Sequence, residues 1–176
     1  MRNIGIFQDN FPIHWISVNT RESISVVDFG AGYFGKLSFV SPNVKYKIGI
    51  EIFQEYIDES RFEDCVKVNG NFLKYRELVN SKFYDTALII DALEHVTKEE
   101  AFKFIQMLQE DFNRILLEIP IGNHPQKGNK NKWQEHKSTW SVNEIELMGF
   151  DVVYISNYHT DKQKDSGCLF ANWEKV

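Results

Sequence analysis

A glycine-rich stretch and a later acidic residue could together bind a nucleotide. Gly30–Gly35 reads Gly-Ala-Gly-Tyr-Phe-Gly and directly follows the apolar run Ser25–Phe29, while a second run, Tyr46–Glu51, ends in Glu51. Glycine permits the positive φ values of a tight turn and lets a ligand lie against the backbone. The first turn of a following helix offers free N–H groups to an anion. A carboxylate at the tip of the neighbouring strand can accept hydrogen bonds from ribose hydroxyls, so the pattern indicates an adenosine-containing ligand.

Other polar residues also stand where apolar runs end. Asp28, Asn71 and Asp91 each occupy such a position. The carboxyl ends of parallel strands meet at one edge of a sheet, where ligands bind. We therefore expect these side chains to contribute to the same site as Glu51.

Histidines offer candidates for acid–base chemistry. His95 follows the apolar run Asp85–Asp91, and we weigh a catalytic role equally against a packing or capping role, because histidine titrates near neutral pH but also packs well. His124 and His136 lie in a long polar segment, where we expect solvated residues. Their spacing matches no metal-ligand pattern, so we expect no metal site.

Four further side chains each have two interpretations. Glu94 either faces an acceptor or stabilises a helix start, and Glu118 is either a site residue or an edge residue, since a buried carboxylate needs a partner. Trp133 and Trp140 either form an aromatic wall for an acceptor or pin their loop to the body. The residue pattern leaves these alternatives open.

The elements that would position these residues alternate between strand and helix. Strands are expected at Ser25–Phe29, Tyr46–Glu51, Cys65–Val68, Asp85–Asp91, Ile115–Ile119, Phe150–Asn157 and Cys168–Trp173. Helices are expected at Tyr33–Val40, Phe53–Phe62 and Lys74–Ser81, and after the capping boxes Thr97–Glu100 and Ser141–Glu144. This alternation predicts an α/β fold with a parallel sheet covered on both faces. The polar turn between the last two strands indicates an antiparallel hairpin.

The expected organisation is one domain, 24–176, preceded by an irregular lead-in or lid, 1–23. We expect this lead-in to contain a helical turn and to cover the core, with a cover over the ligand as the alternative. The chain has 176 residues and a formal net charge of −5. This charge disfavours nucleic acid or an anionic membrane as the main partner. The sequence has no apolar run long enough to span a membrane, and its two cysteines indicate reduced thiols in a cytoplasmic protein.

The chain resembles the class I S-adenosylmethionine-dependent methyltransferases. The resemblance rests on Val27–Gly32, Gly49–Glu51, Gly70-Asn71 and Asp91–Val96, which reads Asp-Ala-Leu-Glu-His-Val. It implies a Rossmann-like, seven-stranded, mostly parallel sheet with an antiparallel C-terminal strand and helices on both faces. The chain departs from the usual Gly-x-Gly-x-Gly turn, and Asn71 stands where the family usually has aspartate.

Carried over position by position, the resemblance implies S-adenosylmethionine as cofactor. Asp28 belongs to this cofactor-binding set, and Gly30, Ala31 and Gly32, followed by Tyr33, would lie near the methionine part. Glu51 would bind the ribose. Ile52, Asn71 and Phe72 would surround the adenine, while Asp91, Ala92 and Leu93 would line the sulfonium end. His95 would face the acceptor as the catalytic candidate.

Two other functions stay open. Gly30–Gly35 matches dinucleotide-binding spacing, so an NAD(P)-dependent oxidoreductase is the first alternative, although the Leu93-Glu94-His95 segment has no role in such an enzyme. A binding protein that has lost catalysis is the second, because little chain lies outside the core fold. The expected acceptor is a small or carrier-borne molecule, and a homodimer is left open.

Overall fold

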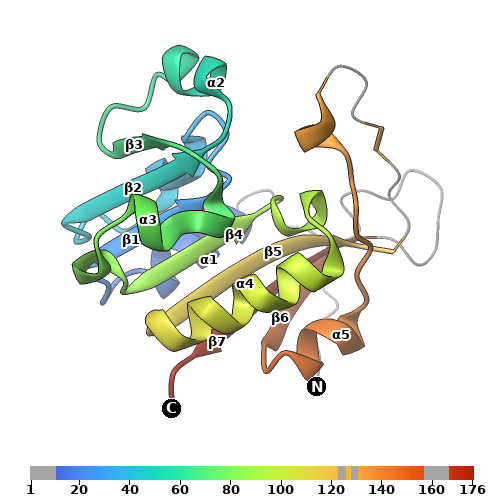
Figure 1. The fold of residues 1–176 in the computed structure, drawn as a ribbon. Coiled ribbons are helices and arrows are strands. Elements are labelled where there is room, and N and C mark those ends of the chain that lie inside the picture. Colours follow the sequence, from blue (N-terminus) through green and yellow to red (C-terminus); the bar gives the residue numbers. More distant parts are fainter. Residues whose placement is uncertain (1–10, 123–125, 128–130, 157–166) are drawn as a thin grey trace.

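The computed structural model describes residues 11–122, 126–127, 131–156 and 167–176. These residues form a seven-stranded sheet in the order β3-β2-β1-β4-β5-β7-β6 (Figure 1). Its strands are β1 Ser25–Phe29, β2 Tyr46–Glu51, β3 Val66–Asn69, β4 Thr86–Ile90, β5 Arg114–Ile121, β6 Asp151–Ser156 and β7 Gly167–Glu174. Each expected strand is present, with ends that differ by at most a few residues.

Strand direction confirms the predicted sheet. The neighbours from β3 through β5 pair in parallel, whereas β7 is antiparallel to both β5 and β6. The last strand therefore inserts between β5 and β6. This order differs from the 3-2-1-4-5-6 order of the dinucleotide-binding fold.

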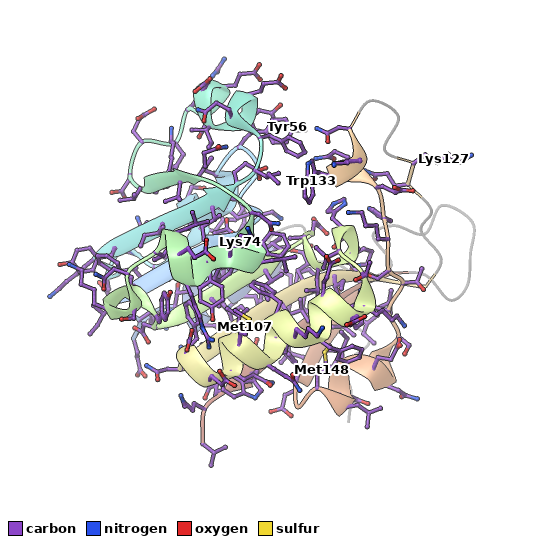
Figure 2. The ribbon with its side chains drawn as sticks, viewed as in Figure 1. Tyr56, Lys74, Met107, Lys127, Trp133 and Met148 are labelled. Atoms are coloured by element: carbon purple, nitrogen blue, oxygen red, sulfur yellow. The ribbon has the colours of Figure 1, made fainter. Side chains whose placement is uncertain are left out.

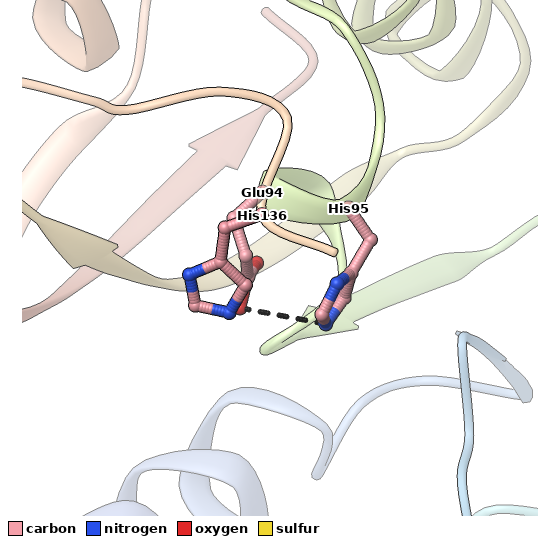
Figure 3. A group of neighbouring side chains, drawn as sticks. All are labelled: Glu94, His95 and His136. Atoms are coloured by element: carbon pink, nitrogen blue, oxygen red, sulfur yellow. Dashed lines mark ion pairs between the residues drawn. The ribbon is translucent and has the colours of Figure 1, made fainter. Parts of the chain in front are cut away.

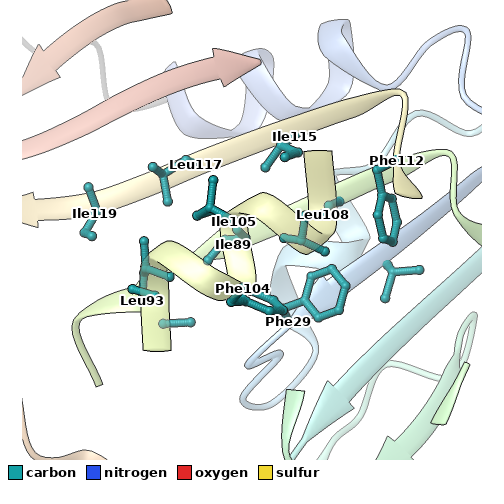
Figure 4. Packing of buried hydrophobic residues seen from close by; sticks show 14 of the residues in the cluster. Phe29, Ile89, Leu93, Phe104, Ile105, Leu108, Phe112, Ile115, Leu117 and Ile119 are labelled. Atoms are coloured by element: carbon teal, nitrogen blue, oxygen red, sulfur yellow. The ribbon is translucent and has the colours of Figure 1, made fainter. Parts of the chain in front are cut away.

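Alternating side chains divide the core between the two faces of the sheet. Val27 and Phe29 belong to one buried cluster, and Val26 belongs to the other. Successive strand residues point to opposite faces, so apolar residues at consecutive positions require cover on both sides. In Figure 4, Phe104 and Leu108 of α4 (Lys98–Asp111) pack on the first face.

The remaining helices complete these two layers. They are α1 Phe11–Asn19, α2 Gln54–Glu59, α3 Tyr75–Leu78 and α5 Val142–Leu147, with 3-10 segments η1 Gly35–Phe39, η2 Phe72–Lys74, η3 Ser81–Phe83, η4 Leu93–His95 and η5 Lys132–Gln134. Both predicted capping boxes form, at Thr97 with Glu100 and at Ser141 with Glu144. No helix in the described ranges is long and apolar enough to cross a membrane.

The lead-in contains more structure than the sequence suggested. Helix α1 has nine residues rather than a single turn, and it buries Trp15 and Ile16 in the second cluster. The Trp15 indole N–H also donates to the Asn172 side-chain oxygen at 2.9 Å. None of α1 lines the cavity described below. Residues 1–10 lie outside the described part of the chain, so the boundary at 23 stays a prediction.

The short helix expected over Tyr33–Val40 is present as a 3-10 helix, η1, and not as an α-helix. Phe34 before it has a left-handed backbone with φ of 65°. The stretch contains Gly35, Ser38 and Val40, which are weaker helix formers, and Pro42 ends it. An α-helix there would be too short to offset the free-energy cost of helix nucleation. No α-helix dipole therefore points at a ligand from this position.

Candidate functional site

A cavity of about 610 Å³ opens at the carboxyl ends of the parallel strands. This volume lies within the roughly 300–1,000 Å³ typical of ligand pockets. The predicted site residues that line it are Gly30, Gly32, Glu51, Ile52, Asn71, Phe72, Asp91, Ala92 and His95. Residues at or just after the carboxyl ends of β1, β2, β3 and β4 thus converge on one cavity, as expected from the sequence.

Four predicted residues do not line this cavity. Asp28 is buried one position before the end of β1, and Ala31 and Leu93 belong to opposite hydrophobic clusters. Tyr33 is 51% exposed and packs against Tyr56, with ring centroids 4.5 Å apart. In the cavity as it stands, these residues support the lining residues rather than face the open space.

The glycine turn holds the backbone close to the cavity. The N–H groups of Gly30 and Ala31 both donate to the Ile50 carbonyl at 3.0 Å. Gly30 has a φ of 77° and leaves no room for a side chain, because a Cβ there would lie 2.8 Å from the Ala92 Cβ. Gly32 has a φ of 54°, and a Cβ there would meet no atom within 4 Å. The absence of a side chain at Gly30 therefore allows close packing against Ala92, whereas Gly32 borders open space.

Glu51 ties the end of β2 to this turn. Its carboxylate accepts hydrogen bonds from the N–H of Gly32 at 2.8 Å and of Phe53 at 3.0 Å. Burial raises the pKa of Glu51, and these backbone donors act in the opposite direction. A carboxylate has about four acceptor sites, so two such bonds leave acceptor capacity for ligand hydroxyls.

Asn71 and Phe72 form the next part of the wall. The Asn71 side-chain oxygen accepts the Leu73 N–H at 3.0 Å and caps η2. Its amide NH2 group is therefore the end suited to donate to a ligand. Phe72 offers a ring face beside it, packed at 5.0 Å against Phe104.

A group of buried acids lies beneath the cavity on the α1 face. Neither Asp28 oxygen has a hydrogen-bond partner among the described residues, and burial raises the pKa of Asp28 to about 7. The Glu118 carboxylate lies 3.6 Å from the Lys36 ammonium and accepts the Cys168 thiol at 3.3 Å. Burial raises the pKa of Glu118 to about 6, with the Asp91 charge as the next cause. Glu118 is thus a buried residue with a cationic partner, not a solvated edge residue.

A second group of titratable side chains lines the other half of the cavity. Glu94 and His95 belong to η4, and His136 comes from the segment after β5 (Figure 3). The Glu94 carboxylate lies 4.0 Å from the His95 Nε2 atom, and the two imidazole rings are 5.0 Å apart. Burial lowers the pKa of His95 and raises the pKa of Glu94 to about 8.

The backbone fixes the segment that carries His136. The N–H groups of Lys137 and Ser138 both donate to the Glu94 carbonyl, at 2.8 and 3.2 Å. The N–H of His136 donates to the Gln126 carbonyl at 3.1 Å. Of the two loop histidines, His136 is therefore a half-buried cavity residue, which corrects the expectation of a solvated one. His124 lies outside the described residues.

Some lining residues were not predicted from the sequence. Phe53 and Tyr56 follow β2, and Gln126 and Gln134 come from the segment after β5. The position of Tyr56 in the helix after Glu51 was a usable signal. Figure 2 shows Tyr56 projecting from α2 and Trp133 from η5, and both line the cavity. Nothing in the glutamines' sequence context marks them, because loop conformation decides their place.

Comparison with known proteins identifies the fold. No protein-family model matches the chain, and no curated protein matches it significantly. Solved structures do match it. The methyltransferase domain of bacterial CtHen1-CN aligns with a TM-score of 0.64 at 15% identity, covering 94% of this chain and 98% of that one.

Two further structures were determined with a cofactor or its product. Magnesium protoporphyrin IX methyltransferase from Synechocystis PCC 6803, with bound SAM, aligns with a TM-score of 0.61 at 17% identity over 98% of this chain and 87% of that one. The Burkholderia thailandensis 1,6-didemethyltoxoflavin-N1-methyltransferase, with S-adenosylhomocysteine, aligns with a TM-score of 0.63 at 12% identity. The alignment covers 96% of this chain and 80% of that one. The chain therefore has the fold of the class I S-adenosylmethionine-dependent methyltransferases, which confirms the fold that the sequence resemblance implied.

Proposed function

We propose that this protein is a methyltransferase that binds S-adenosylmethionine in the cavity and methylates a small molecule. One observation carries the proposal: the glycine turn, Glu51, Asn71 and Asp91 line a single cavity at the carboxyl edge of a methyltransferase-type sheet. Ligands bind at this edge in open α/β sheets.

The residues present fit the adenosyl half of this cofactor. Gly32 borders open space that a side chain would fill, and Glu51 keeps acceptor capacity beside it. We assign Glu51 to the ribose hydroxyls and the Asn71 amide to the adenine edge. Ile52 and Phe72 supply apolar surface for the adenine ring.

The methionine half would lie toward β4. Gly30 and Ala92 give a close-packed backbone surface there, and Asp91 supplies a carboxylate on the cavity wall. Asp28 lies beneath as a buried carboxyl without a hydrogen-bond partner among the described residues. Acidic groups on this side favour a cationic ligand such as an ammonium or a sulfonium. Ala31, Tyr33 and Leu93 support the wall from behind.

The acceptor would occupy the half formed by η4 and the segment after β5. Bound S-adenosylmethionine supplies an electrophilic methyl group on a sulfonium. The protein's part is to hold the acceptor atom in line with it and to exclude water, which is worth several kcal/mol. Trp133, Tyr56 and His95 line the cavity, and His95 would contact the acceptor. Its imidazole can accept the acceptor's proton or hold a cation, and these two roles are separable by experiment.

The acceptor itself is proposed as a small molecule, with a carrier-borne group as the alternative. The proteins of similar fold bear names for different acceptors, including magnesium protoporphyrin IX and 1,6-didemethyltoxoflavin. Such variety fits a fold whose acceptor pocket comes from loops.

Calorimetry with S-adenosylmethionine, S-adenosylhomocysteine and NAD tests the proposal. Binding of the two sulfur compounds without NAD binding is expected, and the reverse would assign the cavity to a dinucleotide. Release of S-adenosylhomocysteine with a panel of acceptors then tests turnover. Cofactor binding without turnover across a wide panel would favour the catalytically inactive alternative.

A further inference from the structure

Three side chains in the acceptor half have the donor atoms of a metal site. Glu94, His95 and His136 each offer one ligand atom, and these atoms all lie within 4.8 Å of one another (Figure 3). Ligands 2.0–2.2 Å from a common ion lie up to about 4.4 Å apart. Small side-chain rotations would therefore bring the three atoms onto one cation.

One oxygen of the Glu94 carboxylate lacks a partner in the part of the chain that the structure describes, and a bound cation would be such a partner. Its side chain is 3% exposed, and its Oε2 atom has no hydrogen-bond partner among the described residues. A buried carboxylate without a partner is costly, and the Asp91 and Glu118 carboxylates add further negative charge nearby. A bound cation would offset both costs.

His95 is oriented as metal-ligating histidines are. Its Nδ1 atom lies 3.3 Å from the Glu135 carbonyl oxygen, which can only accept a hydrogen bond. Donation from Nδ1 leaves the Nε2 lone pair free, and Nε2 is the atom 4.0 Å from the Glu94 carboxylate. A second hydrogen bond that fixes the tautomer in this way is the usual support of a metal-bound imidazole.

The protein also fixes the third ligand. His136 is distant in sequence, but the bonds from the Lys137 and Ser138 N–H groups to the Glu94 carbonyl hold its segment against η4. The same residue, Glu94, therefore provides a carboxylate donor and anchors the backbone next to His136.

A neighbouring cluster is a weaker candidate. Asp91, Glu118 and Cys168 also have ligand atoms within 4.8 Å of one another. Glu118 already has the Lys36 ammonium at 3.6 Å and accepts the Cys168 thiol, so its charge is compensated by the protein. The Glu94 carboxylate has no lysine or arginine ion pair among the described residues.

We propose that Glu94, His95 and His136 bind a divalent transition-metal cation at the acceptor end of the cavity. Two imidazoles and a carboxylate suit Mn²⁺, Fe²⁺, Co²⁺ or Zn²⁺ better than Mg²⁺. The open side of the site faces the cavity, because all three residues line it. If the proposed methyl transfer holds, an acceptor hydroxyl on such a cation would lose its proton more readily. This proposal departs from the expectation of no metal site, which rested on sequence spacing alone.

Calorimetry on the cofactor-free protein tests this inference. Zn²⁺, Mn²⁺ and Mg²⁺ are titrated separately, and Co²⁺ is followed by its visible absorption, which reports imidazole ligands. We expect one Zn²⁺ or Co²⁺ per chain, with affinity reduced at least about tenfold in Glu94→Gln and in His136→Gln. The matched control is His14→Gln, because His14 is exposed on α1 and away from the cavity.

The outcomes separate this proposal from the proposed function. Absence of binding by the parent protein, or equal affinities in the parent and both variants, would overturn the metal site. Circular dichroism checks that each variant is folded, and His95→Gln serves as a third variant if one is not. S-adenosylmethionine is titrated into the same samples, so loss of cofactor binding and loss of cation binding are read independently.

Discussion

The Glu51 carboxylate accepts a hydrogen bond from the backbone N–H of Gly32, with 2.8 Å between oxygen and nitrogen. The end of β2 thereby holds the turn that follows β1. Glu51 is thus both part of the cavity wall and a support for the glycine turn. A change at Glu51 acts on the ligand and on the turn together, and variants can separate these two effects.

Glu51→Ala is expected to weaken S-adenosylmethionine binding by about 1–3 kcal/mol, the scale of a hydrogen bond to a charged group. Glu51→Gln retains an acceptor for Gly32 but loses the charge, so it should fall between the alanine variant and the parent. Glu55→Ala, on the exposed face of α2, is the matched control. Equal affinities of Glu51→Ala and the parent by calorimetry would exclude the ribose assignment.

Gly32→Ala is expected to weaken cofactor binding at least about tenfold, because its methyl group enters the space where a ligand would contact the backbone. The left-handed backbone adds a folding cost of about 1–2 kcal/mol. Gly35→Ala is the matched control in the same turn. A Cβ at Gly35 would meet no atom within 4 Å, its φ is not positive, and Gly35 does not line the cavity. Comparable affinities of the two variants would show that the turn does not contact the ligand.

The raised pKa of the buried Asp28 carboxyl should make the stability of the protein depend on pH. Its pKa in the folded protein is about 7, against an ordinary value of 3.8, and burial is the main cause. Between these values the folded chain binds a proton that the unfolded chain has released. The stability that Asp28 contributes is therefore full below pH 3.8 and is lost as the pH rises through 7.

Asp28→Asn removes this titration. From pH 5 to pH 8, the free energy of unfolding of the variant should rise relative to the parent by roughly 2–3 kcal/mol. Urea unfolding at several pH values measures the difference, and Asp151→Asn on the exposed start of β6 is the control. A constant difference between Asp28→Asn and the parent over this range would contradict the account.

Local sequence signals predicted the sheet well. β1 and β2 have the expected bounds, because apolar β-branched runs that end at Asp28-Phe29 and Glu51 can hardly form another element. The convergence of Glu51, Asn71 and Asp91 follows from strand direction alone. Side-chain type and strand order thus suffice to locate the cofactor half of the cavity.

The acceptor half could not be predicted in the same way. The place of His136 depends on hydrogen bonds between the Glu94 carbonyl and the Lys137 and Ser138 N–H groups, and no local pattern encodes that contact. Metal-ligand spacing in sequence fails for the same reason, since His95 and His136 meet only after the chain has passed through α4 and β5. Backbone strain at Asp91, with a φ of 50°, is likewise invisible in its residue type.

Thr97→Ala tests a feature that the sequence did reveal. The Thr97 side chain accepts the N–H of Glu100 at the start of α4, and Glu100 bonds back to the Thr97 N–H at 2.9 Å. Loss of this capping box should lower the free energy of unfolding by about 1 kcal/mol. Urea unfolding checks the value, with Thr97→Ser as the variant that retains the cap. An alanine variant as stable as the parent would show that the cap contributes nothing.

A crystal structure with bound S-adenosylhomocysteine tests the central claim most directly. We predict that the ribose hydroxyls lie within hydrogen-bond distance of Glu51 and that the adenine lies beside Asn71 and Phe72. The sulfur should face the space bordered by Asp91 and His95. A ligand bound away from Gly32 and Glu51, or no bound ligand at saturating concentration, would contradict the account.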